Sequence, residues 1–263
     1  MDKAYLIEKT GTDNVIRLFQ SDDYMMRQFV AEACDINDKK DREYLSMLMT
    51  DEHYMVRWAV AEKGFGLDVL VNDESEKVRL AVAWKARLDV PEEKELVDLL
   101  VDDEHYSVRQ CIAKKGYMLD KYIEDSNDSV RAAVAWACDI NDEKGREYLD
   151  RLMCDSSLTV RCAVAKKGYK MIDIMNGEGC ERRLRISERM EICKSVVKAC
   201  DVNNPEHCEI LDILLSDSNP AIRILVMMKN YKLDVLENDE VEEVREQVKM
   251  YKRKQAKKNK GKL

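Results

Sequence analysis

Two histidines occupy matching places in a repeated stretch of this sequence, and their surroundings raise the question of acid–base chemistry. "DEHYMVRWAVAEKGF" spans residues 51–65 and "DEHYSVRQCIAKKGY" spans 103–117, so His53 corresponds to His105 and Arg57 to Arg109. A His close to an Arg would supply a base and an anion clamp. No Ser or Cys nucleophile is shared by the two copies, since Ser107 and Cys111 correspond to Met55 and Ala59. We therefore interpret both histidines as solvent-facing residues of a first helical turn.

Cysteine chemistry is the second possibility, since the chain has nine cysteines and three histidines. The odd number and the lack of a CxxC pair favour reduced thiols over disulfides. One repeat position holds Cys34, Cys138, Cys200 or Ala86, which indicates a small buried slot. Further cysteines gather near His207, at spacings that match no zinc-ligand motif: Cys180, Cys193, Cys200 and Cys208. We expect no catalytic residues, no metal and no cofactor.

The matching stretches belong to a longer internal repeat. Its pattern is Asp, five residues, Arg, and then a cluster of small residues and Val. Successive Arg positions lie 30, 22, 30, 22, 30, 62 and 22 residues apart, so the unit has about 52 residues in a long and a short half. Such self-similarity is typical of a helical solenoid. The Asp and Arg positions are Asp51 and Arg57, Asp73 and Arg79, Asp103 and Arg109, Asp125 and Arg131, Asp155 and Arg161, Asp217 and Arg223, and Asp239 and Arg245, with a looser copy around Arg27.

Each copy reads as a capped helix. The Asp stands where an N-cap belongs, and Val78, Ala81 and Val82 show the spacing of one buried helical face. The helix ends at Gly followed by an aromatic residue, with Asn230 in the Gly place of one copy, which predicts a left-handed C-terminal cap. The long halves contain a second helix over 91–101, whereas 66–72 of a short half has room for one tight turn.

The repeated Asp and Arg resemble those of the HEAT-repeat family, and the alternating long and short units are similar to its bacterial leucine-rich-repeat-variant relatives. The resemblance covers roughly residues 10–250. It implies an all-α, right-handed solenoid in which Asp and Arg form a ladder between neighbouring repeats. We expect one array over 1–248. The family includes scaffolds, transport receptors, bilin lyases and an alkyl-purine DNA glycosylase group, so it does not fix the function.

Two parts of the array depart from the pattern. Residues 1–20 hold a degenerate unit, as expected of a capping end. In the unit over 176–200, Ser187 and Cys193 occupy the Asp and Arg positions, and an insertion over 176–185 precedes them. The joint loss is expected if the Asp and Arg of one copy depend on each other, because removing one alone would strand a partly buried charge.

Charge and hydropathy narrow the classes of partner. The net charge is −8, yet the segment 249–263 holds eight Lys or Arg and no acids. We expect this basic tail to be disordered, and we expect nucleic acid to bind nowhere except through it, because the remaining body is acidic. No apolar run is long enough to span a membrane and no export signal is visible, which predicts a cytoplasmic protein. The oligomeric state is left open.

One face of the repeated helices carries the aromatic residues, including every Trp of the chain. If the Val and Ala positions face the core, the opposite face forms a stripe that would line the concave side of a HEAT-like array. Tyr, Trp and Met dominate the energetics of protein interfaces. The predicted stripe consists of Tyr24, Tyr54, Met55, Trp58, Leu80, Trp84, Tyr106 and Trp136.

These patterns favour a non-catalytic scaffold that binds a partner protein or peptide in its concave groove. The alternative is a nucleic-acid-binding or processing protein similar to the HEAT-like alkyl-purine DNA glycosylases, since aromatics in a groove suit an extruded base. The acidic body argues against this alternative. A bilin-lyase-like role is a third reading, for which the sequence offers no pair of nucleophile and base.

Overall fold

A computed structural model describes residues 17–180 and 183–260, and all of its regular elements in these ranges are helices. The chain divides into two compact units, Met1–Tyr122 and Ile123–Leu263, and each is described by itself. No helix in the described ranges is long and apolar enough to cross a bilayer.

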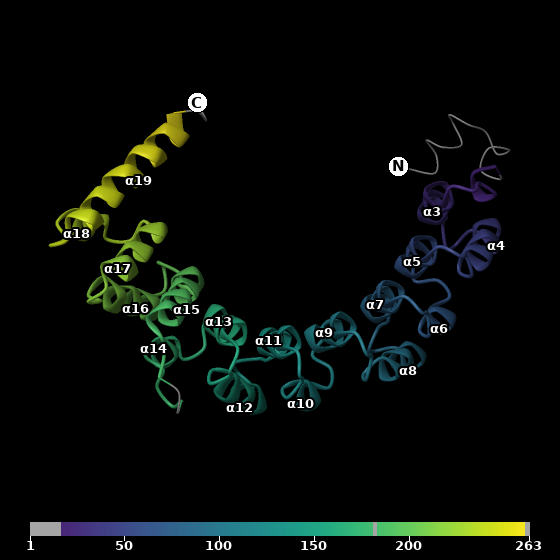
Figure 1. Ribbon diagram of the computed structural model, residues 1–263, viewed down its shortest axis with the longest axis horizontal. Coiled ribbons are helices and arrows are strands. Elements are labelled where there is room, and N and C mark those ends of the chain that lie inside the picture. The colour runs from purple at the N-terminus through teal and green to yellow at the C-terminus, as the bar shows by residue number, and fades with distance from the viewer. Residues whose placement is uncertain (1–16, 181–182, 261–263) are drawn as a thin grey trace. The chain divides into compact units, whose positions relative to one another are not determined.

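The first unit contains two rows of helices (Figure 1). We call α3, α5, α7 and α9 its odd row, because these helices pack on one another in chain order, and α4, α6, α8 and α10 its even row. The bounds are α3 (Tyr24–Ala33), α4 (Lys39–Leu48), α5 (Tyr54–Glu62), α6 (Leu67–Leu70), α7 (Glu76–Lys85), α8 (Pro91–Leu99), α9 (Tyr106–Lys114) and α10 (Leu119–Tyr122).

The second unit repeats the arrangement (Figure 1). Its odd row is α11, α13, α15, α17 and α19, again packed in chain order, and the connecting helices α12, α14, α16 and α18 form its even row. The bounds are α11 (Asp128–Ala137), α12 (Glu143–Leu152), α13 (Leu158–Lys167), α14 (Met171–Asn176), α15 (Ile186–Ala199), α16 (Pro205–Leu215), α17 (Pro220–Val226), the 3₁₀ turn η1 (Met227–Lys229), α18 (Leu233–Glu237) and α19 (Glu242–Lys260).

The predicted helix ends are confirmed. Gly64, Gly116 and Gly168 all have φ between 75° and 86°, and Asn230 takes the same left-handed conformation with φ 53°. The connectors also follow the sequence, since α8 begins at Pro91 and the short connector forms the single turn α6. That turn is α-helical, however, and not 3₁₀.

The predicted helix starts need a correction. The repeated Asp is not the N-cap, because its carboxylate accepts the backbone N–H two residues later, as in Asp51 to His53 at 2.9 Å. That later residue is the N-cap, and the Nδ1 atoms of His53 and His105 accept the N–H of Met55 and Ser107. The Asp therefore forms a turn that leads into the cap. Both histidines are half-buried capping residues and not solvent-facing.

The core follows the predicted face of each odd-row helix. Val78, Ala81 and Val82 are 0–2% exposed. The slot shared by Cys and Ala is also buried, as predicted, since Cys34, Cys138, Cys200 and Ala86 are each at most 5% exposed. Small side chains there let the next element approach the helix end closely.

The C-terminal segment differs from the prediction. Residues 249–260 continue α19, whereas we expected a disordered tail; residues 261–263 lie outside the described part of the chain. Residues 242–260 contain neither Gly nor Pro, and Glu242 and Glu243 begin a helix that ends among lysines. Both charge patterns match the helix dipole, and most of these residue types are good helix formers.

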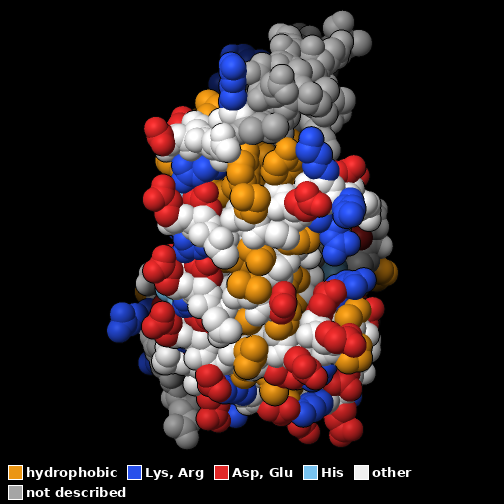
Figure 2. Space-filling model, turned by 90° about the vertical axis from the view of Figure 1, so that its right-hand side faces the viewer, with side chains coloured by type: hydrophobic (Ala, Val, Ile, Leu, Met, Phe, Trp, Pro, Cys, Tyr) orange, Lys and Arg blue, Asp and Glu red, His pale blue; other side chains and the backbone are white. Residues whose placement is uncertain are grey.

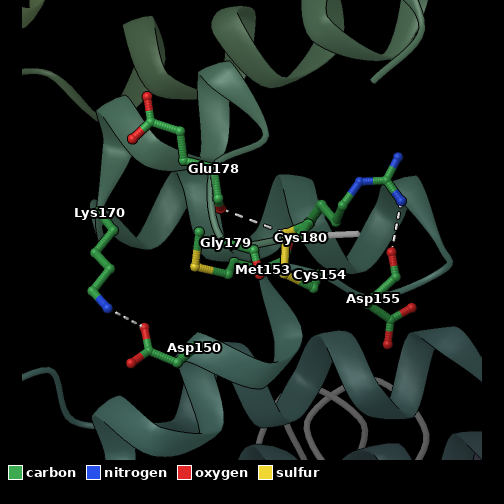
Figure 3. The surroundings of a disulfide bond; sticks show 9 residues. Asp150, Met153, Cys154, Asp155, Lys170, Glu178, Gly179 and Cys180 are labelled. Carbon is green, nitrogen blue, oxygen red and sulfur yellow. Dashed lines mark hydrogen bonds and ion pairs between the residues drawn. A yellow bond between two sulfur atoms is a disulfide. The ribbon is translucent and has the colours of Figure 1, made fainter. Parts of the chain in front are cut away.

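Reduced thiols were expected throughout, and this prediction is wrong for one pair. Cys154, just after α12, forms a disulfide with Cys180 in the insertion (Figure 3). Close to it, Lys170 contacts Asp150 at 2.6 Å. The bond ties the insertion to the even row of the second unit. The remaining cysteines form no disulfide in the described part of the chain: Cys34, Cys111, Cys138, Cys162, Cys193, Cys200 and Cys208.

Candidate functional site

The repeated Asp and Arg form a regular chain of ion pairs along each unit. The Arg57 guanidinium contacts both carboxylate oxygens of Asp73, at 2.6 Å from Nε and 2.9 Å from Nη2. Its third nitrogen, Nη1, donates to the backbone carbonyl of Asp51 at 2.8 Å. Bidentate pairs with the same geometry join Arg27 to Asp51, Arg79 to Asp103, Arg131 to Asp155, and Arg223 to Asp239.

Each of these five Arg residues thus connects two copies, and the carboxylate it holds belongs to the next copy. Within one copy the Arg donates to the backbone carbonyls of the Asp and of the residue after it, as Arg109 and Arg245 also do. The sequence-based idea that the Asp and Arg of one copy are lost as a mutually dependent pair is therefore wrong. Losing both in the irregular copy affects two different neighbours, the Arg before it and the Asp after it.

The irregular copy repairs both contacts with new residues. The preceding Arg161 contacts Glu188 through Nη2 at 3.1 Å, and the following Asp217 is bound by Arg189 at 2.6 Å. Glu188 and Arg189 lie in the first turn of α15, and Cys193 is fully buried in the Arg position. The repair is incomplete, because the buried Nε of Arg161 has no hydrogen-bond partner among the described residues.

Hydrogen bonds favour the charged form of three ladder carboxylates, those of Asp51, Asp217 and Asp239. The guanidinium of Arg223 is the main cause that lowers the pKa of Asp239. For Asp51 and Asp217, burial is the largest effect and would raise the pKa. Hydrogen bonds from Arg27 and Arg189, together with backbone N–H donors, outweigh it, so both pKa values are lowered. These arginines are engaged in the ladder and do not present a row of anion-binding groups.

Three of the cysteines outside the disulfide are poorly suited to chemistry. Burial raises the pKa of Cys138, Cys193 and Cys200 to about 11, which keeps them protonated at neutral pH. No group of three or more His, Cys, Asp or Glu in the described residues is placed to hold a metal ion. The cysteines near His207 therefore do not come together as a ligand set.

The predicted stripe separates into two parts in the first unit. Tyr24 and Tyr54 lie at the edge where the odd-row helices begin. Tyr24 stacks on His53 with ring centroids 3.6 Å apart, and the hydroxyl of Tyr54 accepts a hydrogen bond from Lys77 at 3.0 Å. These contacts place the two tyrosines beside the ladder. Tyr106 begins α9 in the same way and is exposed.

Trp58, Leu80 and Trp84 are brought together. They line a groove of about 370 Å³ on the odd row of the first unit. The indole of Trp84 is prominent, since this residue is 61% exposed. The groove lies over α5, α7 and α9, and its lining consists of Trp58, Glu62, Leu80, Ala81, Trp84, Ser107, Gln110, Cys111 and Lys114.

The other predicted stripe residues do not line this groove. Met55 is half-buried on α5, and Trp136 is 45% exposed on α11 in the second unit. The stripe missed Glu62 and Lys114, although both occupy the repeat position of Trp84, five residues after the ladder Arg. The equivalent repeat position is the sequence signal that could have identified these two residues. A charged residue at the position that holds Trp in another copy lies on the same face of its helix.

Exposure alone does not identify a site. On the face of the molecule in Figure 2, hydrophobic side chains form an interrupted central stripe with acidic and basic side chains on both sides. Scattered apolar groups of this kind are ordinary on protein surfaces. The groove of the first unit differs because it is hollow and is lined by two indoles, and hollow sites with a few convergent polar groups are the usual ligand sites of proteins.

Comparison with known proteins adds information on the fold alone. No protein-family model and no curated protein matches the sequence. The X-ray structure of the Escherichia coli protein YibA is similar, with a TM-score of 0.50 and 17% sequence identity. The match covers 87% of this chain and 95% of YibA. At this identity the likeness indicates a shared helical fold and carries no function across.

Proposed function

We propose that the chain is a HEAT-like solenoid of alternating repeats of about 30 and 22 residues that acts as a non-catalytic scaffold. Its groove over α5, α7 and α9 receives a segment of a partner protein. The regular ladder supports the repeat assignment, because it joins equivalent residues of successive copies. The binding role is supported mainly by one observation, the groove that places the indoles of Trp58 and Trp84 in one hollow.

Energetics favour this use of the groove. Trp side chains bury a large apolar area with few rotatable bonds, so they act as anchors at low cost in conformational entropy. The helices that carry them are fixed by buried ladder pairs, so the groove exists before a partner arrives. The indole of Trp84 is exposed, so it contributes little to packing in the core.

The experiment is a pull-down with wild type and with Trp84→Ala, followed by identification of the captured protein and a binding assay with that protein in purified form. Trp136→Ala is the matched control, because Trp136 holds the same repeat position and is also exposed but lies in the other unit. We expect Trp84→Ala to weaken binding by about tenfold or more, and Trp136→Ala to leave it unchanged. Equal affinity of wild type and of a folded Trp84→Ala protein would refute the groove.

A second candidate function rests on α19. Its described residues from Lys249 onward are rich in Lys and carry no acids, a composition that suits contact with nucleic-acid phosphates. The full chain and a version that ends at residue 248 would be compared for binding to a DNA duplex and to single-stranded RNA over a salt series. A salt-dependent affinity that disappears with α19's basic end would support this role.

A further inference from the structure

The charges at the groove indicate which partner chemistry it accepts, and this inference rests on the proposed function. Two charged side chains line the groove, Glu62 and Lys114. Glu62 is already neutralised, since its carboxylate lies 3.3 Å from the ammonium of Lys85. Lys114 is exposed and makes no hydrogen bond or ion pair among the described residues. The lining therefore has one uncompensated charge, and it is positive.

The neighbouring Lys115 differs from Lys114, because its ammonium is engaged in hydrogen bonds within the protein. Lys115 donates to the backbone carbonyls of Trp84 and Ala86, at 2.8 and 2.7 Å, and so caps the C-terminal end of α7. Burial lowers the pKa of Lys115, consistent with its partly enclosed ammonium. In the second unit, Lys167 makes the same bond to the carbonyl of Trp136. The second Lys of each pair is structural, whereas the first is left at the surface.

The position of Lys114 is the variable one of the repeat. Five residues after the ladder Arg, successive copies of the first unit have Glu32, Glu62, Trp84 and Lys114. The ladder Arg is kept in all of these copies, and the ladder Asp in all but the first, which has Ser21, while this slot changes in charge and size. A slot that varies on a constant framework is where a repeat protein sets its specificity.

We propose that the groove binds a partner segment in which an apolar side chain inserts between Trp58 and Trp84 and a neighbouring Asp or Glu side chain pairs with Lys114. The groove's volume of about 370 Å³ suits a short segment and not a whole helix. The first unit as a whole is acidic, with 26 Asp or Glu against 18 Lys or Arg among residues 1–122. That field is screened over about 8 Å at physiological salt, so the contact with Lys114 decides the preference inside the groove.

The test uses short peptides, acetylated and amidated so that no terminal charge takes part. Each has a central Leu-Phe pair flanked by Glu, by Gln or by Lys, and none contains Trp. Binding is followed through the tryptophan fluorescence of the full-length protein, in which Trp58 and Trp84, but not Trp136, line the groove. Wild type is expected to bind the Glu peptide about tenfold more tightly than the Lys peptide, with the Gln peptide between them. Lys114→Glu is expected to reverse this order.

Lys39→Glu is the control, because it changes the net charge equally and lies exposed at the start of α4, in the even row. It should keep the wild-type order of affinities. An order that Lys114→Glu leaves unchanged overturns the inference, and so does the absence of binding by every peptide. If the partner found in the pull-down depends on Trp84 but not on Lys114, the proposed function stands and only the acidic preference fails.

Discussion

The regular ladder and the irregular copy solve one structural problem with different residues. In the regular copies a single Arg binds the next carboxylate through two nitrogens and its own turn through the third. In the irregular copy, Glu188 and Arg189 divide the task between the preceding and the following neighbour. The division leaves each contact with one hydrogen bond where the regular pair has two, and it leaves Arg161 with an unsatisfied buried nitrogen.

The cause of the difference lies at the helix start. A regular odd-row helix begins three residues after the repeated Asp, as Tyr54 follows Asp51, so that the Asp stays in the preceding turn. α15 begins at Ile186, and Ser187 in the Asp position is already inside the helix. Its first turn therefore carries the acidic group that a loop carries in the regular copies. Each ladder contact of the irregular copy thus keeps one of the two Arg–carboxylate hydrogen bonds of a regular pair.

Acid should produce the largest loss in the free energy of unfolding, because it protonates many carboxylates at once. The pKa values of Asp51, Asp217 and Asp239 are lowered in the folded protein. Their contribution to stability is complete above the unfolded-state pKa of about 4 and is lost as the pH falls through the lower folded-state values. We expect the free energy of unfolding to decrease below about pH 4 in urea titrations. Asp51→Asn should flatten this decrease, and curves that stay parallel to wild type would contradict the assignment.

Breaking one regular pair should cost more than breaking one repaired pair. Arg57→Ala leaves the buried carboxylate of Asp73 without its main partner, and we expect a loss of about 3–5 kcal/mol in the free energy of unfolding. Arg189→Ala removes one bond from a side chain that is 32% exposed, and Asp217 keeps the backbone N–H of Asn219. We expect a loss of about 1.5 kcal/mol there. Equal losses for the two variants, measured by urea denaturation, would show that the copies are equally well held.

The sequence predicts the regular region far better than the irregular one, for a physical reason. The helix ends depend on local conformation, which Gly64 and Asn230 reveal by type alone. The partner of Arg57 is a choice between two equivalent Asp residues, and spacing within one copy cannot distinguish them. The disulfide of Cys154 depends on how an insertion folds back over 26 residues, for which no repeated pattern exists.

The groove, too, could be predicted from the sequence only in part. Trp58 and Trp84 were predicted to share a face, and the structure brings them together. Lys114 was not predicted, because a charged residue on an exposed helical face is the ordinary case in any sequence. Its equivalence to Trp84 in the repeat becomes informative only once the hollow between the helices is known.

Removing the disulfide should have an intermediate effect confined to the irregular region. A bridge across 26 residues restricts the unfolded chain, and Cys180→Ser is expected to cost about 3 kcal/mol or less. Thermal unfolding with and without a dithiol reductant provides the measurement. Wild type should become less stable when reduced, whereas Cys180→Ser should not respond. A wild-type protein that is indifferent to reductant would mean that the bond contributes nothing to the native state.

The smallest change in the free energy of unfolding is expected for Ser187→Asp, although the sequence suggests that this substitution would restore the ladder. Ser187→Asp restores the residue type of the ladder, and a restored ladder would satisfy the Nε of Arg161 and add about 1–3 kcal/mol. Ser187 is exposed in the first turn of α15, not in the turn that precedes a regular helix. We therefore expect a change within about 0.5 kcal/mol, from the favourable placement of an acid at a helix start. A gain above about 1.5 kcal/mol would show that the start of α15 can unwind to the regular position, and that the residue type, more than the helix boundary, separates the two regions.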